Sequence, residues 1–284
     1  MAAGRTPRVS SPWGGPGRQY HGPGRQLSGE RNKADPSSDH PARGNGQHSL
    51  LQAGRQRRAD ARPAYQESGG TFKAPEFALV YLSFWQSLVP DEIRSGLCEL
   101  IKNVLAIHPH RYEEVAALLN PEARYSQDQF AQVFSWCFEA KQAVMRHDAH
   151  EQLTALVLEA GHTVGHALES LLGMKHGLAI ALGLLVEAHI SHARGWLSDR
   201  EVQQHYALLE RNGVQTTLPQ TLDIDALLKI IRDDNKIGYL PRREDQHVMV
   251  LLRHLGQPVE ERPGLPLTYV SEKELRTALG TLRA

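Results

Sequence analysis

Residues Leu158–Gly183 read LEAGHTVGHALESLLGMKHGLAIALG and contain two helical patterns in succession. In the first pattern, His162 and His166 are four residues apart and Glu169 follows three residues later, so an α-helix would project all three from one side. The opposite side of that helix is aliphatic, which ordinary core packing explains. The two imidazoles and the carboxylate are therefore available for chemistry.

The second pattern begins at His176 and Gly177 and continues through small and aliphatic residues to Gly183 without a charge. It predicts a buried helix with His176 at its N-terminal edge. Neutral imidazole is the commonest metal ligand, so His162 and His176 could supply two of the three protein ligands of a catalytic divalent metal. Two histidines at helical spacing are also common as surface or packing residues, and the spacing alone leaves both interpretations open.

A third ligand, a carboxylate, would have to come from another part of the chain. Pro90 opens a helical pattern with an apolar stripe, and Glu99 and Lys102 lie on the side away from that stripe. One interpretation is a solvated ion pair worth about 0.2–0.5 kcal/mol. The other makes Glu99 the missing ligand and Lys102 a phosphate or hydroxyl contact. The spacing by itself favours the ion pair.

The first 66 residues are rich in Gly, Pro, Arg, Ser and Gln, and their only aliphatics larger than alanine are Val9, Leu27, Leu50 and Leu51. Such a segment cannot bury enough apolar surface to offset the entropy of ordering, so residues 1–69 are expected to form a disordered tail. The tail is basic, but it lacks interleaved aromatic residues, and no nucleic-acid partner is expected. Its composition also resembles GC-rich DNA translated out of frame.

The rest of the composition indicates an intracellular protein. The only cysteines among the 284 residues are Cys98 and Cys137, which fits a reducing compartment and excludes a disulfide framework or a cysteine zinc cluster. No apolar run approaches the roughly 18 residues of a membrane helix, and the N-terminus lacks the apolar segment of a signal peptide. We expect a cytoplasmic protein with no membrane partner.

Residues 70–284 are expected to form a mostly α-helical domain with a few strands at its edges. Capping boxes, in which a serine precedes a glutamate by three residues, mark helix starts at Ser198 and Ser271, and Gly213 should close the first of these helices. Besides the helices already described, helices are expected near residues 128–145, 198–213, 226–231 and 271–279. Strands are expected at 77–82, where both faces are apolar, and at 247–252 and 267–270.

Four motifs in matched order resemble the 3-dehydroquinate synthase superfamily: CELIKN (98–103), EAGHTVGHALE (159–169), HGLAIALG (176–183) and DNK (234–236). The resemblance extends from about Gly70 to the C-terminus and implies a dehydroquinate-synthase-like C-terminal helical domain.

Within this superfamily, IRSGLCELIKNVLAIHPHR (93–111), DNKIGYLP (234–241) and HVMVLLRHLG (247–256) are most similar to 2-deoxy-scyllo-inosose synthases. Those enzymes are carbon–oxygen lyases that convert D-glucose 6-phosphate to the carbocycle of aminocyclitol antibiotics, with release of phosphate. The family's NAD takes a hydride and returns it.

Carried over residue by residue, the resemblance implies that Glu99, His162 and His176 bind a divalent metal, cobalt or zinc. It further implies catalytic roles for Lys102, Glu159 and His166, and contacts to a sugar phosphate from Lys141, Asn235 and Lys236. The expected partner is therefore a small-molecule sugar phosphate, with a homodimer as one expected assembly.

Two positions at or near the second motif differ from dehydroquinate synthases. Dehydroquinate synthases have an arginine for the substrate carboxylate seven residues before the first histidine, where this chain has Ala155. A substrate without a carboxylate is therefore favoured, and 3-dehydroquinate synthase activity is disfavoured. Glu159 replaces the family's usual asparagine and could act as an acid or a base.

The family's NAD-binding domain should precede Thr71, and its Gly-Lys-Asn segment is replaced here by Tyr65, Gln66 and Glu67. Residues 1–66 cannot form a parallel sheet or a cofactor loop. From this, the chain is expected to bind a metal but not to turn over glucose 6-phosphate by itself. A non-catalytic metal-binding remnant is a further alternative.

Overall fold

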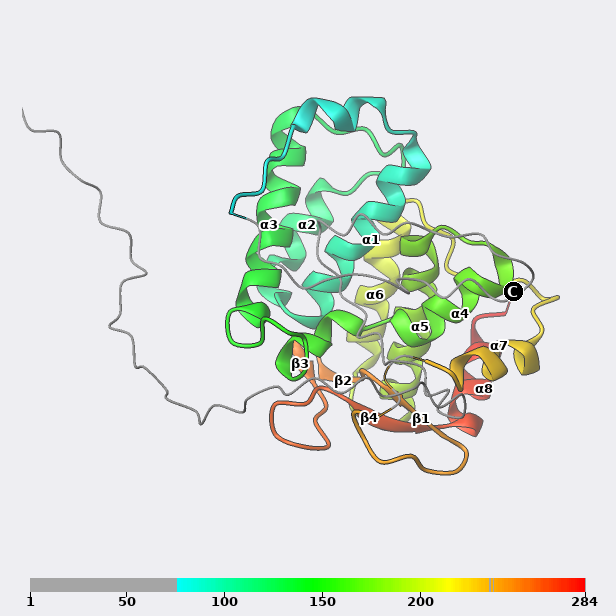
Figure 1. Cartoon of the computed structure of the whole chain (residues 1–284). Coiled ribbons are helices and arrows are strands. Elements are labelled where there is room, and N and C mark those ends of the chain that lie inside the picture. The colour runs from blue at the N-terminus through cyan, green and yellow to red at the C-terminus, as the bar shows by residue number, and fades with distance from the viewer. Residues whose placement is uncertain (1–75, 235, 237, 284) are drawn as a thin grey trace, which may run out of the picture. The chain divides into compact units, whose positions relative to one another are not determined.

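In the computed structural model, the buried helix expected from His176 onward is α5 (His176–Ala193). Four helices pack against it: α1 (Pro90–Ala106), α4 (His162–Leu172), α6 (Asp199–Arg211) and α8 (Glu272–Thr281) (Figure 1). A helix that is apolar on all sides is stable only when neighbours cover it on all sides, and α5 is covered in this way. The structure describes residues 76–234, 236 and 238–283. Two predictions fall outside these residues: the disordered, possibly out-of-frame tail at 1–69, and the substrate contact from Asn235.

The remaining elements complete a mostly helical fold, as the sequence predicts. In the described part of the chain, the short 3-10 helices are η1 (Leu82–Ser87), η2 (Pro109–Arg111) and η3 (Thr154–Glu159). The other helices are α2 (Tyr112–Leu118), α3 (Gln127–Met145) and α7 (Ile224–Ile231), and the strands are β1 (Gln246–Met249), β2 (Leu252–His254), β3 (Gln257–Pro258) and β4 (Thr268–Ser271). Among the described helices, none has both the length and the hydropathy that a membrane span needs.

The predicted helix caps are present. Ser198 accepts a hydrogen bond from the backbone N–H of Glu201, and Ser271 accepts one from that of Glu274, with each glutamate returning the contact. Gly213 has φ +69° just after α6, as expected of a residue that closes a helix.

The strands form two separate antiparallel pairs. β1 pairs with β4, with Gln246 opposite Ser271 and Met249 opposite Thr268, whereas β2 pairs with β3. The single strand expected over residues 247–252 is therefore wrong in its extent. The chain changes partner at the fully buried Val250 and Leu251, which lie between β1 and β2.

The strand expected at residues 77–82 is also wrong. Residues 77–81 have no regular secondary structure, and η1 begins at Leu82. Phe77 is 79% exposed and Leu79 is 81% exposed, so neither contributes to the core. A strand needs a neighbour for its backbone hydrogen bonds, and no other described segment pairs with this one.

Candidate metal centre

The three predicted ligands come from three helices and meet at one point. Glu99 is on α1, His162 is the first residue of α4 and His176 is the first residue of α5. Glu99 Oε1 lies 3.8 Å from His162 Nε2 and 3.7 Å from His176 Nε2, and the three ligand atoms all lie within 4.8 Å of one another. Tetrahedral ligands at about 2.1 Å from one ion would be about 3.4 Å apart. The donor set and its spacing therefore fit a divalent metal after a small adjustment.

Close packing of α1 on the start of α5 brings Glu99 to His176. The backbone N–H of Gly177 donates to Ser95 Oγ at 3.0 Å. A Cβ atom on Gly177 would lie 1.8 Å from the carbonyl oxygen of Ser95, so only glycine allows this approach. The glycine that follows His176 therefore has a direct role in assembling the site.

Both histidines are oriented through Nδ1. His162 Nδ1 lies 3.0 Å from the carbonyl oxygen of Ala160, which can only accept, so Nδ1 carries the proton and Nε2 presents its lone pair. His176 Nδ1 lies 3.1 Å from Glu169 Oε2. Metal-binding histidines are commonly held in this way by a carbonyl or a carboxylate. Glu169 thus orients a candidate ligand, a role that its spacing from His162 did not reveal.

Lys102 is not part of a solvated surface. Its Nζ donates to Glu99 Oε2 at 2.6 Å, and its side chain is 1% exposed. Glu99 thus contacts the lysine through one oxygen and faces the histidines with the other. The burial of Lys102 contradicts the solvated ion pair that the spacing favoured.

Lys141 and His166 lie around the same centre. Lys141, on α3, has a pKa below that of an ordinary lysine because it is partly buried and because the positive charge of Lys102 is close. The His166 ring lies 5.1 Å from that of His162 and 5.7 Å from that of His176, measured between centroids. With Glu99 and Lys102, the structure thus gathers six charged or titratable side chains that the sequence selected.

A second buried ion pair links two of the motifs. Lys236 Nζ lies 2.9 Å from Glu159 Oε2 and 3.1 Å from Asp234 Oδ1, and the Lys236 and Glu159 side chains are 1% and 5% exposed. Burial opposes the charge on Lys236, but the carboxylates of Asp234 and Glu159 prevail and raise its pKa above the usual range. Because Glu159 precedes His162 by three residues, this pair connects the DNK motif to the histidine helix.

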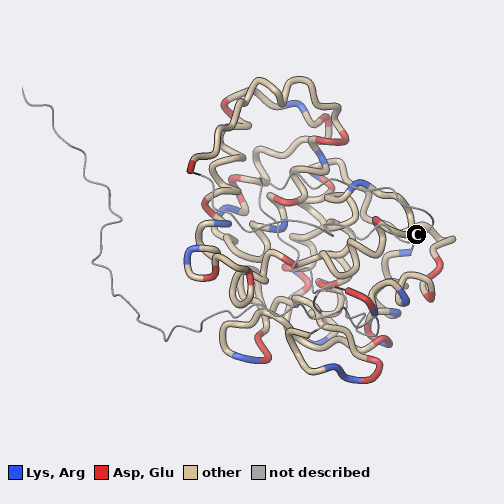
Figure 2. Tube along the Cα trace, viewed as in Figure 1, with Lys and Arg blue, Asp and Glu red and all other residues tan. Residues whose placement is uncertain are grey.

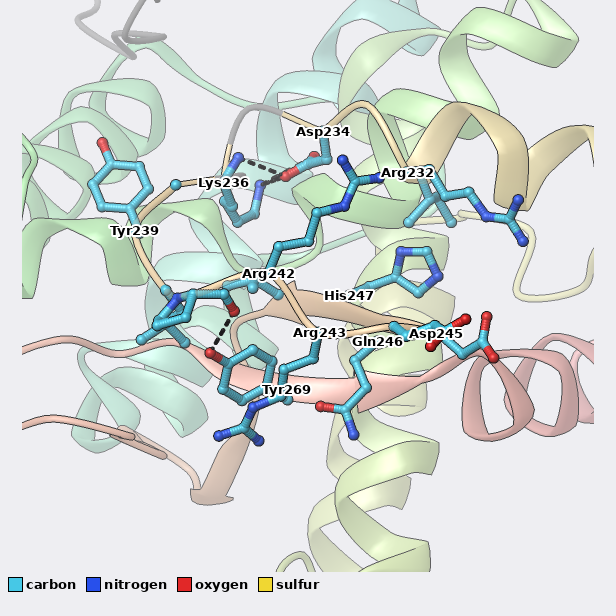
Figure 3. Close-up of a pocket in the computed structure, with 16 residues that line it drawn as sticks. Arg232, Asp234, Lys236, Tyr239, Arg242, Arg243, Asp245, Gln246, His247 and Tyr269 are labelled. Atoms are coloured by element: carbon cyan, nitrogen blue, oxygen red, sulfur yellow. Dashed lines mark hydrogen bonds and ion pairs between the residues drawn. The ribbon is translucent and has the colours of Figure 1, made fainter.

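Beside Lys236 is a cavity of about 790 Å³, which sequence reasoning did not predict (Figure 3). Its lining includes Asp234, Arg232, Arg242 and His247 but none of the three candidate ligands. Residues 238–245, just before β1, all line it, and basic residues in this stretch are followed directly by acidic ones (Figure 2). The cavity therefore shares Lys236 and Asp234 with the buried ion pair and is not lined by the candidate ligands.

Ala155, where a carboxylate-binding arginine was expected for dehydroquinate synthase, is buried in η3. Its backbone N–H donates to Asp148 Oδ2 at 3.0 Å, and the same carboxylate also accepts from Gln152 and Leu153. The Asp148 carboxylate therefore holds this segment through its backbone N–H groups, and position 155 offers no cation.

The fold and the site define a class of protein. The family described as 3-dehydroquinate synthase C-terminal matches residues 96–237, half of the 284 residues, so the chain belongs to the 3-dehydroquinate synthase C-terminal family.

Its relatives are more specific. The chain is 41% identical over 209 residues to the 2-deoxy-scyllo-inosose synthase of Micromonospora echinospora, a match that covers 72% of this chain and 53% of that protein. It is 38% identical to the enzyme of the same name from Streptomyces kanamyceticus, over 66% of this chain and 49% of that one. The resemblance found in the motifs is confirmed, and the chain spans about half the length of the curated relatives it matches.

Solved structures agree. A 2-deoxy-scyllo-inosose synthase complexed with carbaglucose-6-phosphate, NAD+ and Co2+ matches with a TM-score of 0.64 and 31% identity, over 70% of this chain and 54% of that one. A 2-epi-5-epi-valiolone synthase from Streptomyces hygroscopicus with NAD+ and Zn2+ bound has a TM-score of 0.54 at 17% identity, covering 71% of this chain and 54% of that one, and shows a likeness of fold alone.

Proposed function

We propose that this chain is the metal-binding and substrate-binding part of a 2-deoxy-scyllo-inosose synthase, a carbon–oxygen lyase of aminocyclitol antibiotic biosynthesis. The reaction converts D-glucose 6-phosphate to 2-deoxy-scyllo-inosose and releases phosphate. The observation that carries the proposal is the convergence of Glu99, His162 and His176 beside buried Lys102, in a chain similar to enzymes of that name.

Glu99, His162 and His176 would hold a cobalt or zinc ion, which polarises a sugar hydroxyl for oxidation and a carbonyl for ring closure. Lys102 and Lys141 supply positive charge for the phosphate and hydroxyls of the substrate. His166, beside the two ligand histidines, is proposed as a contact to substrate rather than as a ligand. Because the pKa of Lys141 is lowered, it gives up its proton more readily than an ordinary lysine.

Glu159 is proposed to accept and donate a proton, and Lys236 is proposed to contact the substrate. The Glu159 carboxylate accepts a hydrogen bond from the Lys236 ammonium, so a proton could be held or released at Glu159 Oε2 without exposing a bare charge. Glutamate can perform this role, whereas the asparagine usual in dehydroquinate synthases cannot.

NAD is bound by solved neighbours of the chain, and in the family it takes a hydride and returns it. In residues 76–234, 236 and 238–283, the strand that leads directly into a helix is β4, and no glycine lies between β4 and α8. The described residues therefore offer no phosphate-cradling loop, and we assign no step through NAD to them.

The alternative of a 3-dehydroquinate synthase is not favoured, because relatives at 36–41% identity are 2-deoxy-scyllo-inosose synthases and because Ala155 offers no charge to a carboxylate. A homodimer and a cytoplasmic location stay predictions, the latter motivated by the free thiols of Cys98 and Cys137.

Calorimetry with carbaglucose-6-phosphate tests the proposed site. The Co²⁺-loaded chain should bind this analogue more tightly than the metal-free chain does, and Glu99→Ala should abolish the difference. The carboxylate-bearing substrate of 3-dehydroquinate synthase should bind more weakly. Equal binding of the analogue with and without Co²⁺ would contradict the proposal.

Turnover is tested by phosphate release from glucose 6-phosphate in the presence of NAD⁺ and Co²⁺. Because the chain spans about half the length of its relatives, the assay includes a fusion to the unmatched part of the Micromonospora echinospora synthase. Phosphate release that depends on Glu99 and His162 is expected. A folded fusion that binds Co²⁺ and NAD⁺ but releases no phosphate would instead support a non-catalytic metal-binding remnant.

A further inference from the structure

Glu187 is the one acidic residue of helix α5, whose other buried residues are mostly small or aliphatic, and no step proposed above uses it. Its side chain is buried, with the residue 5% exposed, and burial raises its pKa well above the usual range. Burying a carboxyl group is unfavourable unless a hydrogen bond compensates. An acidic residue at such a position therefore needs a specific partner.

The partner is the start of the histidine helix. Glu187 Oε2 accepts a hydrogen bond from the backbone N–H of Gly161 at 2.7 Å. Gly161 is the residue before α4, it has φ +77°, and a Cβ atom on it would lie 2.7 Å from the carbonyl oxygen of Ile180. Serine or aspartate, the usual helix caps, cannot occupy that position. In a capping box the N–H of the cap residue donates to the side chain at the third position of the helix, which in α4 is Val164, so Glu187 supplies from α5 an acceptor that the first turn of α4 lacks.

The same peptide group also orients a candidate ligand. The N–H of Gly161 and the carbonyl of Ala160 belong to one planar peptide unit. Glu187 holds the N–H end at 2.7 Å, and His162 Nδ1 lies 3.0 Å from the carbonyl oxygen at the other end. Hydrogen bonds in such a chain polarise one another, so a bond at the N–H strengthens the carbonyl as an acceptor.

We propose that Glu187 is a positioning residue for the metal centre, which acts on His162 through the Ala160–Gly161 peptide. It fixes the plane of that peptide, the peptide carbonyl fixes the tautomer and direction of the imidazole, and Nε2 is thereby aimed at Glu99 and His176. The inference deepens the proposed function, because it rests on the metal role of His162.

The first test compares Glu187→Gln with Glu187→Leu by titration with Co²⁺ and by the visible spectrum of the bound ion. Glutamine keeps an acceptor oxygen at the same reach, whereas leucine removes it. The glutamine variant should bind Co²⁺ within about threefold of the parent chain, and the leucine variant about 10–100-fold more weakly with an altered spectrum. Parent-like affinity and spectrum in Glu187→Leu, or equal weakening in both variants, would overturn the proposal.

Two further variants control for general disturbance of α5 and for a failure of Glu187→Leu to fold. Ser191→Ala removes a hydroxyl that is fully buried one turn further along α5 and has no hydrogen-bond partner among the described residues, so its Co²⁺ affinity should equal that of the parent. If Glu187→Leu fails to fold, Glu187→Asp replaces it, because its shorter side chain remains acidic but falls short of Gly161. Parent-like binding by a folded Glu187→Asp would count against the proposal.

A second readout needs no metal. The ¹⁵N chemical shifts of the His162 ring should show the proton on Nδ1 in the metal-free parent and in Glu187→Gln, and a mixture of tautomers in the leucine or aspartate variant. A parent chain that binds no Co²⁺ would refute the proposed metal centre, while the shifts would still decide whether Glu187 sets the tautomer of His162. An unchanged tautomer in every variant would refute the role of Glu187.

Discussion

Glu169 Oε2 on α4 lies 3.1 Å from His176 Nδ1 on α5, so a carboxylate on one helix orients an imidazole on the next. Groups that orient a metal ligand in this way commonly contribute 10–100-fold to metal affinity. Glu169→Ala is therefore expected to weaken Co²⁺ binding by about tenfold or more, measured by competition with a chromogenic chelator. Ser170→Ala, at the exposed neighbouring position on α4, serves as the control. Unchanged affinity in Glu169→Ala would show that His176 is oriented by other means.

The three clustered histidines should differ in what they bind. His162 Nε2 and His176 Nε2 lie 3.8 and 3.7 Å from Glu99 Oε1, whereas His166 contributes no atom to the candidate ligand group. Equilibrium dialysis should show at least a hundredfold loss of Co²⁺ affinity in His162→Ala and His176→Ala and about a threefold change in His166→Ala. His166→Ala should instead weaken binding of carbaglucose-6-phosphate. Loss of Co²⁺ in His166→Ala would make His166 a ligand.

Local patterns in the sequence predicted contacts between residues that are close together in the chain, but they did not predict contacts between distant segments. The helix starts at Ser198 and Ser271 were predictable because a capping box is complete within four residues. The Glu99–Lys102 pair was misjudged, because its spacing is local but the burial of Lys102 depends on segments distant in sequence. Glu187 was missed for the same reason, since its partner Gly161 is 26 residues away.

The same reasoning explains the error at residues 77–82. Alternating apolar residues indicate that a segment can be a strand, but a strand also requires a neighbour, and periodicity contains no information about one. The motif resemblance succeeded where local patterns did not, because it identified Glu99 and the two histidines together. Geometry then showed that they meet.

The buried Glu159–Lys236 pair should dominate stability near the site. Lys236→Met would leave the carboxylates of Glu159 and Asp234 buried without that ammonium group, and removing one partner of a buried pair commonly costs about 3–5 kcal/mol. Glu159→Gln should cost less, about 1–2 kcal/mol, because Asp234 still faces the lysine. Urea denaturation of the metal-free chain measures both, with exposed Lys229→Met as the control. A smaller loss in Lys236→Met than in Glu159→Gln would contradict this account.

The crossing of α4 and α5 depends on Gly183. A Cβ atom at this position would lie 2.0 Å from the carbonyl oxygen of Gly161, so Gly183→Ala must push the two helices apart. Overpacking of this kind typically costs about 1–3 kcal/mol, and here it should also weaken Co²⁺ binding because it displaces His162. Gly280→Ala is the matched control, since a Cβ atom at Gly280 on α8 meets nothing within 4 Å and alanine favours the helix. Thermal unfolding should show a lower Tm for the first variant and an equal or higher Tm for the second.

Acid sensitivity should be concentrated at Glu274, which joins the end of α5 to the start of α8. Arg194 Nε donates to Glu274 Oε1 at 2.7 Å, and this hydrogen bond, with smaller contributions from Ser271 and the charge of Arg194, lowers the pKa of Glu274 from its ordinary 4.5 to about 2. Because the folded pKa is below the unfolded one, the resulting stabilisation is present above about pH 4.5 and is lost as the pH falls through about 2. After allowance for partial exposure, it should amount to about 1–2 kcal/mol.

Glu274→Gln keeps the acceptor oxygen but removes the charge. Urea denaturation at pH 7 should show a free energy of unfolding lower by about 1–2 kcal/mol, and this deficit should shrink as the pH falls from 4.5 towards 2. The exposed Glu210→Gln on α6 controls for the loss of one negative charge and should show no comparable deficit. A deficit in Glu274→Gln that stays constant over this pH range would mean that Glu274 stabilises the junction of α5 and α8 through hydrogen bonds to Ser271 rather than through its charge.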